Sequence, residues 1–401
     1  MVTHDVGAIG FQPFVDNFAR ETFIAINWPI SDDLKQRGVP DRMKIVGGAA
    51  AHQTEGGPQP AKPAGPVVWE TFKDSEDTYL ANAKLPSGFN EPEIIPQACQ
   101  ALALQHPEAA KRTLTQSAKV SDVLASDVQA FTNKRLIDQN DENVWYDVKL
   151  NRTYFDYVVE SQFYNKDKQK GVISFPASSN TTRGQGTIKV KAAWKVMGSS
   201  GSVQPDNVKE FYTTDALIYN KIEQSCIKQK MGLVGLHVVM KTDQLPQWMW
   251  ATFEHFRNAP TKGEKASGFY NFHNVNCKKS CEPNTPPSSK TDKTPTQVVR
   301  LIPIDSVAAS ANTIFQTALR TLREDNVWGN YELINAQWGA TAEPKGTPNQ
   351  PKYLANTTME TYLQEPVEDK KAPHGCINCH GGYAGNKDLD FQLFKAKAPI
   401  K

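Results

Sequence analysis

Apolar and polar residues alternate along the chain with two different periods, and each period predicts a different kind of element. Apolar residues recur at helical spacing over 116–137 and 305–325, and an apolar segment at 17–29 predicts either a helix or a strand. Elsewhere, alternating or continuous apolar runs rich in β-branched residues predict strands. The predicted strands are 171–178, 186–197, 210–220, 228–256 with Gly235 as a candidate bulge, and 326–338.

This mixture of segments predicts an α+β fold with a central mixed or antiparallel β-sheet, flanking helices and long loops. The Gly- and Pro-rich stretches 47–66 and 282–296 are typical of surface loops. A short helix near 359–365 and a final amphipathic helix at 388–398 are also predicted. The chain then divides into three parts. These are an irregular N-terminal region (1–115), an α+β core domain (116–340) and a C-terminal segment (341–401).

Composition narrows the class of protein. The 401 residues are 39% hydrophobic with a mean hydropathy of −0.53, which is typical of a globular chain that forms a core. The longest apolar run, 231–240, is about half the length that spans a bilayer, so no transmembrane segment is predicted. The 45 basic and 43 acidic residues nearly cancel without a long basic run, and nothing indicates nucleic-acid binding.

The sharpest chemical motif lies near the end of the chain. The stretch "GCINCHGG" places Cys376 and Cys379 three residues apart, and His380 follows directly. Zinc, a redox-active dithiol and covalently attached haem all use two cysteines at this spacing. Zinc would need two more ligands, and the other close pair, Cys277 and Cys281, is spaced one residue wider than usual. A thioredoxin-like pair belongs near the start of its fold, and neither alternative explains the histidine.

Covalent haem explains the histidine as well as the cysteines. Residues three apart in a helix lie one turn apart on one side, so both sulfurs can add to vinyl groups at one edge of the porphyrin. The next residue then directs its imidazole towards the iron. Gly381 and Gly382 let the backbone pass close to the macrocycle because they carry no Cβ.

Over residues 376–380 the chain resembles the attachment segment of c-type cytochromes. The resemblance implies one haem c, thioether bonds from Cys376 and Cys379, and His380 as proximal ligand of the iron. It also implies export, since this attachment takes place outside the bacterial cytoplasm. We therefore expect a periplasmic or secreted protein whose leader has been removed, because the first residues show no signal peptide. A motif near the C-terminus is similar to that of cytochromes c′ and P460, whose sixth position is open, but no four-helix bundle is indicated here.

Four cysteines remain, and an even number in an oxidising compartment suits two disulfides. Three pairings are open. We favour Cys277–Cys281, which closes a small loop, together with Cys99–Cys226, which joins distant segments.

The side of the haem opposite His380 is less defined. The 21 residues after His380 contain neither Met nor His, so an ordinary sixth ligand must come from upstream. The candidates are Met359, His255 and His237, beside an open or water-bound position. A Met or His ligand would saturate the iron and make the function one-electron transfer, whereas an open position would bind oxygen, peroxide or nitric oxide.

The leading prediction is therefore an exported mono-haem c-type cytochrome that exchanges single electrons with a redox partner protein or a small-molecule donor or acceptor. The alternative is a haem enzyme, such as a peroxidase-like oxidoreductase, or a gas-binding protein with an open iron. A third class is a binding module in which haem is a redox-tuned or structural element. No catalytic residue can be named.

Two further patterns bear on the upstream residues. Aromatic residues are dense at 145–164 and 248–256, and since strands favour them we expect most to fill the sheet core. An aromatic pocket close to the haem is the alternative. The stretch 138–147 is faintly similar to a calcium loop but lacks the required glycine and the final glutamate.

Overall fold

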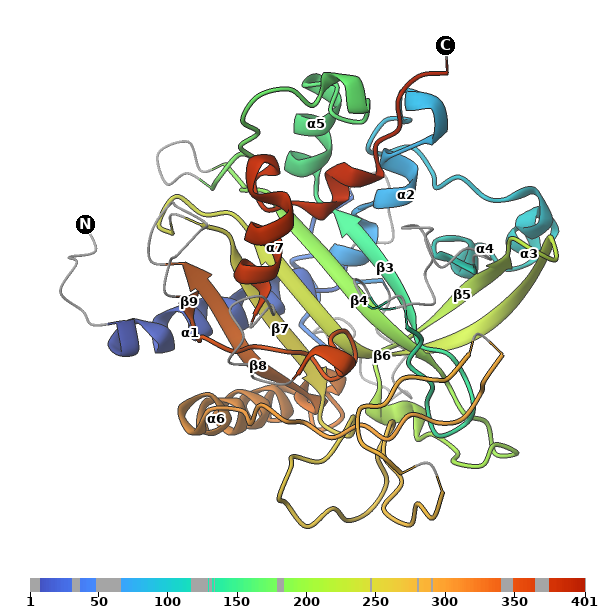
Figure 1. Ribbon diagram of the computed structural model, residues 1–401, viewed down its shortest axis with the longest axis vertical. Helices are drawn as coiled ribbons and strands as arrows, with labels where there is room; N and C mark the ends of the chain where they lie inside the picture. The colour runs from blue at the N-terminus through green and yellow to red at the C-terminus, as the bar shows by residue number, and fades with distance from the viewer. Residues whose placement is uncertain are drawn as a thin grey trace.

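The computed structural model describes residues 8–30, 37–47, 66–116, 129, 132, 134–178, 184–245, 247–279, 281–289, 291–339, 349–364 and 375–400. Its centre is one curled sheet of nine strands, in the order β1-β3-β4-β6-β7-β8-β9, with β5 beside β6 and β2 beside β5 (Figure 1). Neighbouring strands are antiparallel except β2 and β5, which are parallel. The strands are β1 (Lys73–Asp74), β2 (Thr113–Gln116), β3 (Trp145–Leu150), β4 (Ile188–Val196), β5 (Thr213–Asn220), β6 (Ser225–Met240), β7 (Met249–His255), β8 (Tyr331–Gly339) and β9 (Asn349–Gln350).

Helices lie on both faces of this sheet. In Figure 1, α7 crosses in front of the strands while α1 passes behind them. The α-helices are α1 (Ala8–Ile26), α2 (Ser75–Thr78), α3 (Gln100–Gln105), α4 (Pro107–Ala110), α5 (Arg152–Glu160), α6 (Ser306–Leu322) and α7 (Cys376–Ala384). Short 3-10 helices connect them, among them Thr361–Leu363 and Phe391–Lys395.

The face covered by α1 and α6 carries the largest apolar core. Because side chains alternate between faces, every second residue of the central strands points here. Phe23 of α1 packs 4.3 Å from Phe253 of β7 and 5.5 Å from Trp328, between ring centroids. Helix α6 is capped by Asp305, whose carboxylate accepts from Val307 N–H and so satisfies a free donor of the first turn. This side of the sheet is a packed structural core.

The opposite face is covered by the C-terminal part of the chain. Its apolar cluster joins Val239 of β6, Trp250 of β7 and the adjoining Trp248 to Ile377 of α7 and to Leu393. Segment 354–364 lies on the same face, where its turn packs on Gly235. A Cβ at Gly235 would lie 2.2 Å from Thr358 Oγ1, so only glycine lets this turn approach the strand. The predicted motif is thus placed on the sheet rather than on a separate lobe.

The α+β architecture with its mixed, mainly antiparallel sheet is confirmed, as are most strands. The predicted segments 186–197, 210–220, 228–256 and 326–338 coincide, to within five residues, with β4, β5, β6 with β7, and β8, and the register shifts beside Gly235 as expected. The helix at 305–325 is α6 (Ser306–Leu322), and the segment at 17–29 falls largely in α1.

Two of the predicted elements need correction, and a third lies mostly outside the described residues. Segment 171–178 forms no strand: Ile173 and Phe175 are buried, but they cover the apolar cluster without pairing to a neighbouring strand. The final helix at 388–398 is only the 3-10 turn Phe391–Lys395. The helix predicted at 116–137 lies mostly outside the described residues, and the division into three parts stays a prediction.

Candidate haem-binding site

The start of α7 is fixed to strand β8. The Ile377 N–H donates to Gln337 Oε1 at 2.9 Å, and Gln337 Nε2 donates to the Pro351 carbonyl at 2.7 Å. A Cβ at Gly375 would lie 2.3 Å from Gln337 Nε2, so the residue before the first cysteine must be small. These contacts set the height of the motif above the sheet.

Cys376 and Cys379 are the first and fourth residues of α7, and both thiols are free and half-buried. Burial raises the pKa of Cys376 far above its usual value and that of Cys379 to about 12, and the Glu360 carboxylate adds to both shifts. Both thiols are therefore neutral. A redox-active dithiol depends on a lowered thiol pKa, so this environment disfavours the dithiol alternative.

His380 is held in one tautomer. Its Nδ1 lies 2.6 Å from the Leu389 carbonyl, which can only accept, so Nδ1 carries the proton and Nε2 the lone pair. The ring packs 5.4 Å from Trp250 and 4.2 Å from Phe391, between centroids. Burial lowers the pKa of His380 to about 3, and Lys189 adds to this shift. A neutral imidazole anchored through one nitrogen to a backbone carbonyl is the usual state of a metal-ligating histidine.

Polar side chains converge beside the motif. His237 of β6 and Lys191 of β4 are neighbours in register, and His237 Nε2 lies 3.1 Å from Glu360 Oε1. Burial lowers the pKa of Lys191, while the Glu360 carboxylate opposes this shift. The lysine, the carboxylate and both thiols therefore lie within electrostatic range of one another.

Two buried ring nitrogens on this face have no hydrogen-bond partner among the described residues. His237 Nδ1 and Trp250 Nε1 accept or donate no hydrogen bond within the described part of the chain. An unpaired buried polar atom costs about 1–3 kcal/mol, so such atoms are rare unless another group completes the site. Together with two neutral thiols one turn apart and the Nε2 lone pair of His380, this donor set fits a covalently attached haem.

The turn that carries Glu360 is itself anchored. The Asn356 N–H donates to Glu360 Oε2 at 2.9 Å, and Asn356 Nδ2 donates to Thr252 Oγ1 at 2.8 Å and to the Phe253 carbonyl at 3.1 Å. The Asn356 carbonyl oxygen Oδ1 accepts from Thr358. Burial opposes the charge of Glu360, but His237 and Lys191 hold its pKa below the usual value.

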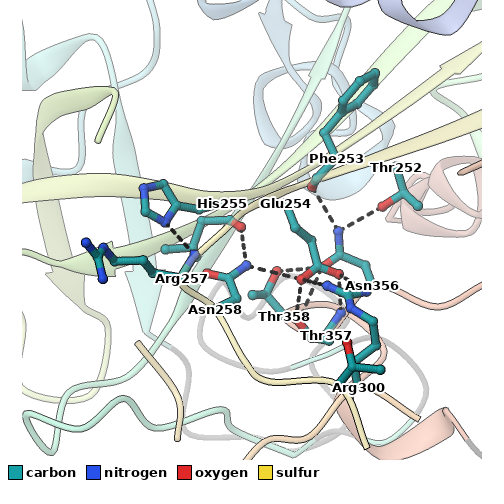
Figure 2. Close-up of polar contacts among 12 residues, drawn as sticks. Thr252, Phe253, Glu254, His255, Arg257, Asn258, Arg300, Asn356, Thr357 and Thr358 are labelled. Atoms are coloured by element: carbon teal, nitrogen blue, oxygen red, sulfur yellow. Dashed lines mark hydrogen bonds and ion pairs between the residues drawn. The ribbon is translucent and has the colours of Figure 1, made fainter. Parts of the chain in front are cut away.

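A buried ion pair also holds this turn, and Figure 2 shows its two partners, Glu254 and Arg300, beside Thr357. Glu254 of β7 is fully buried. Both terminal nitrogens of Arg300 donate hydrogen bonds to its carboxylate, at 3.2 Å to Oε1 and at 2.9 Å to Oε2. The Thr357 N–H donates to Glu254 Oε1 at 2.7 Å, its hydroxyl donates to Oε2, and Asn258 adds a longer contact. The carboxylate thus has donors on both oxygens, which is what stabilises a buried charge.

The three candidate distal ligands have different surroundings. Met359 is buried in a separate apolar cluster with Leu136, Val144 and Phe272. His255 stacks on Phe211 at 4.1 Å between centroids, and its Nε2 bonds to the Glu210 carbonyl at 3.0 Å. Burial lowers the pKa of His255 to about 3, which is typical of a core histidine.

His237 is therefore the candidate that the structure brings to the motif. The sequence reasoning missed its neighbours Glu360 and Lys191. The spacing of Lys189 and Lys191 could have found the lysine, because residues two apart in a strand share a face. Nothing in the local pattern pointed to Glu360, which reaches His237 across 123 residues.

The other cysteines pair as favoured: Cys99–Cys226 and Cys277–Cys281 are disulfides. The second pair is thus not free to complete a zinc centre, and no three His, Cys, Asp or Glu side chains cluster for a metal ion within the described ranges. In the calcium-like stretch, Asp138 turns inward, 3.5 Å from Lys195 Nζ, and accepts from two backbone N–H groups of its own turn.

The aromatic stretches mostly fill cores, as the simpler interpretation predicts. Trp145, Tyr154 and Trp248 are buried, although Phe256 is exposed and Trp250 lies against His380. None of the helices in the described segments is long and apolar enough to cross a membrane. No family model, curated protein or solved structure matches the chain. The resemblance to c-type cytochromes therefore depends on the motif.

Proposed function

We propose that this protein is an exported mono-haem c-type cytochrome that works in one-electron transfer. The haem is attached through Cys376 and Cys379, and His380 is the proximal ligand of the iron. When bound, the haem supplies one-electron redox chemistry at its iron. The chain holds the cofactor, fixes the tautomer of its ligand and shields it from water.

One observation carries this proposal: His380 is neutral, with Nδ1 anchored on the Leu389 carbonyl and Nε2 left with the lone pair. That state suits an iron ligand and has no evident use in a redox dithiol. The thiols of Cys376 and Cys379 are free on the adjoining turn, which is what covalent attachment requires.

Export is supported by the disulfides. Cys99–Cys226 and Cys277–Cys281 are typical of an oxidising compartment, because cytosolic reductants keep such pairs reduced. The periplasm is the compartment where haem attachment and disulfide formation take place together. The partner is a redox protein or a small electron donor or acceptor.

The test is attachment itself. The chain is produced in the periplasm of a host with a cytochrome c maturation system, and the mass of the denatured polypeptide is measured. We expect the mass of one haem on the wild type and on the control variant Cys277→Ala/Cys281→Ala, and none on Cys376→Ala/Cys379→Ala. A wild-type polypeptide without added mass, or haem that survives loss of both motif cysteines, refutes the proposal.

Electron transfer is then tested by spectroscopy. A reduced low-spin spectrum that carbon monoxide leaves unchanged, with a reversible one-electron potential, is expected. A high-spin iron that binds the gas would favour the haem enzyme or gas-binding protein instead.

A further inference from the structure

We propose that His237, oriented by Glu360, is the second axial ligand of the haem iron, on the face opposite His380. This inference rests on the proposed function and deepens it, because two histidine ligands saturate the iron and commit the site to electron transfer.

The free nitrogen of His237 is the first argument. His237 is 7% exposed, and its Nδ1 is buried without a partner in the described part of the chain. Its Nε2 faces a carboxylate oxygen of Glu360 at 3.1 Å. A carboxylate accepts, so Nε2 carries a proton, and Nδ1 is the ring nitrogen left to bind a metal. A histidine whose N–H donates to a carboxylate while its other nitrogen is free is arranged as a metal ligand, and either nitrogen can bind.

The place of His237 is the second argument. It stands on the sheet face that α7 covers, in register with Lys191 of β4 and Thr252 of β7. The next positions of β6 and β7 on this face are Val239 and Trp250, and the Trp250 ring lies 5.4 Å from that of His380 between centroids. His237 is thus one pleat away from the residue that supports the proximal histidine.

The support behind Glu360 is the third argument. Its turn is tied to β7 through Asn356, and the Glu254–Arg300 pair holds Thr357 of the same turn (Figure 2). A ligand is held in its geometry when the groups around it are themselves fixed. Glu360 is therefore a positioning residue, and its carboxylate also makes the imidazole a stronger donor to iron.

The rival ligands are engaged elsewhere. The Met359 side chain is buried in its own apolar cluster, although it is only one residue before Glu360. His255 is stacked on Phe211 and bonded to a backbone carbonyl. Bringing either to the iron would break a packed core.

The experiment compares holoproteins that carry covalent haem. We expect the wild type to be low-spin without the methionine–iron charge-transfer band. His237→Ala should become high-spin and bind carbon monoxide, and added imidazole should restore the low-spin spectrum. The matched control is His273→Ala, which removes a half-buried histidine that bonds the Val298 carbonyl and should leave the spectrum unchanged.

Glu360→Gln tests the positioning role. Glutamine keeps the size of the side chain but loses the charge, so the iron should stay low-spin while its reduction potential rises. A variant that only disturbed folding would instead lose haem or stability without a defined shift of the potential.

The results separate the two proposals. Absence of covalent haem refutes the proposed function. Covalent haem whose low-spin spectrum survives His237→Ala, or a wild type that is high-spin, overturns the assignment of His237 alone. Should His237→Ala fail to fold, His237→Met decides: a methionine–iron band together with a raised potential supports ligation at this position, and an unchanged spectrum refutes it.

Discussion

Replacing Arg300 with methionine should destabilise the protein strongly, because it leaves a charge buried without its counter-ion. Glu254 is fully buried and Arg300 is 3% exposed, so water cannot replace the lost guanidinium. Removing one partner of such a pair costs about 3–5 kcal/mol of unfolding free energy. The Thr357 N–H and hydroxyl still donate to the carboxylate, so we expect a loss near 3 kcal/mol.

A double variant separates the charge from the packing. Glu254→Gln/Arg300→Met has no buried charge, so it should be more stable than Arg300→Met by at least about 1 kcal/mol, although it has lost one more native group.

The assay is urea unfolding followed by circular dichroism with the disulfides intact. The control is Arg323→Met, because Arg323 pairs with Asp325 at the exposed end of α6 and such pairs contribute below about 1 kcal/mol. A loss for Arg300→Met no larger than that of the control would refute the reasoning. So would a double variant that is less stable than Arg300→Met at neutral pH.

Three further predictions follow from the fold. Cys99→Ala/Cys226→Ala opens a loop of 127 residues and should lower the unfolding free energy by about 5 kcal/mol, whereas Cys277→Ala/Cys281→Ala should lower it by about 2 kcal/mol. Thermal melts of both variants measure these losses, and equal losses would contradict the loop-length argument. The pKa of His255 is lowered to about 3, so the folded state binds fewer protons than the unfolded chain, and this group should lower the unfolding free energy by about 2 kcal/mol as the pH falls from 6.5 to 5. His255→Phe should remove this contribution to the pH dependence of the unfolding free energy, measured by urea titrations at several pH values. An unchanged pH dependence would refute the prediction. Gly375→Ala should lower the unfolding free energy by about 1–3 kcal/mol and reduce haem incorporation, because the new Cβ would displace Gln337 from the start of α7. Haem incorporation is measured as Soret absorbance per polypeptide. Full incorporation would contradict the prediction and show that α7 tolerates the shift.

Local sequence patterns were sufficient to predict much of the secondary structure and the cysteine–histidine motif of this protein. The periodicity of apolar residues sufficed for α6 and for the central strands β4 to β8, since each buries one face or one stripe against a neighbour. The motif at Cys376, Cys379 and His380 needed no tertiary information, because its spacing follows from one turn of helix. The same holds for the short disulfide Cys277–Cys281, whose residues are close in the chain.

Local patterns do not predict elements that are stabilised by partners distant in the sequence. Strand β3 reads "WYDVKL", and its Asp147 and Lys149 look like surface residues. They are buried because Arg112 and Asp74 pair with them from other parts of the chain. Conversely, segment 171–178 alternates like a strand because it covers an apolar cluster, but it forms no strand, and Ser178 alone makes an isolated bridge, to Thr242.

Only the tertiary structure distinguishes the two histidines proposed as distal ligands, because residues distant in the sequence surround each of them. By sequence, His237 and His255 are both histidines in apolar strands. The sheet register turns His237 towards α7, and Glu360, 123 residues further along, orients its ring, whereas His255 is enclosed by Phe211 and the Glu210 carbonyl. Local spacing shows which residues can share a face, but only the packing of remote segments decides what that face meets.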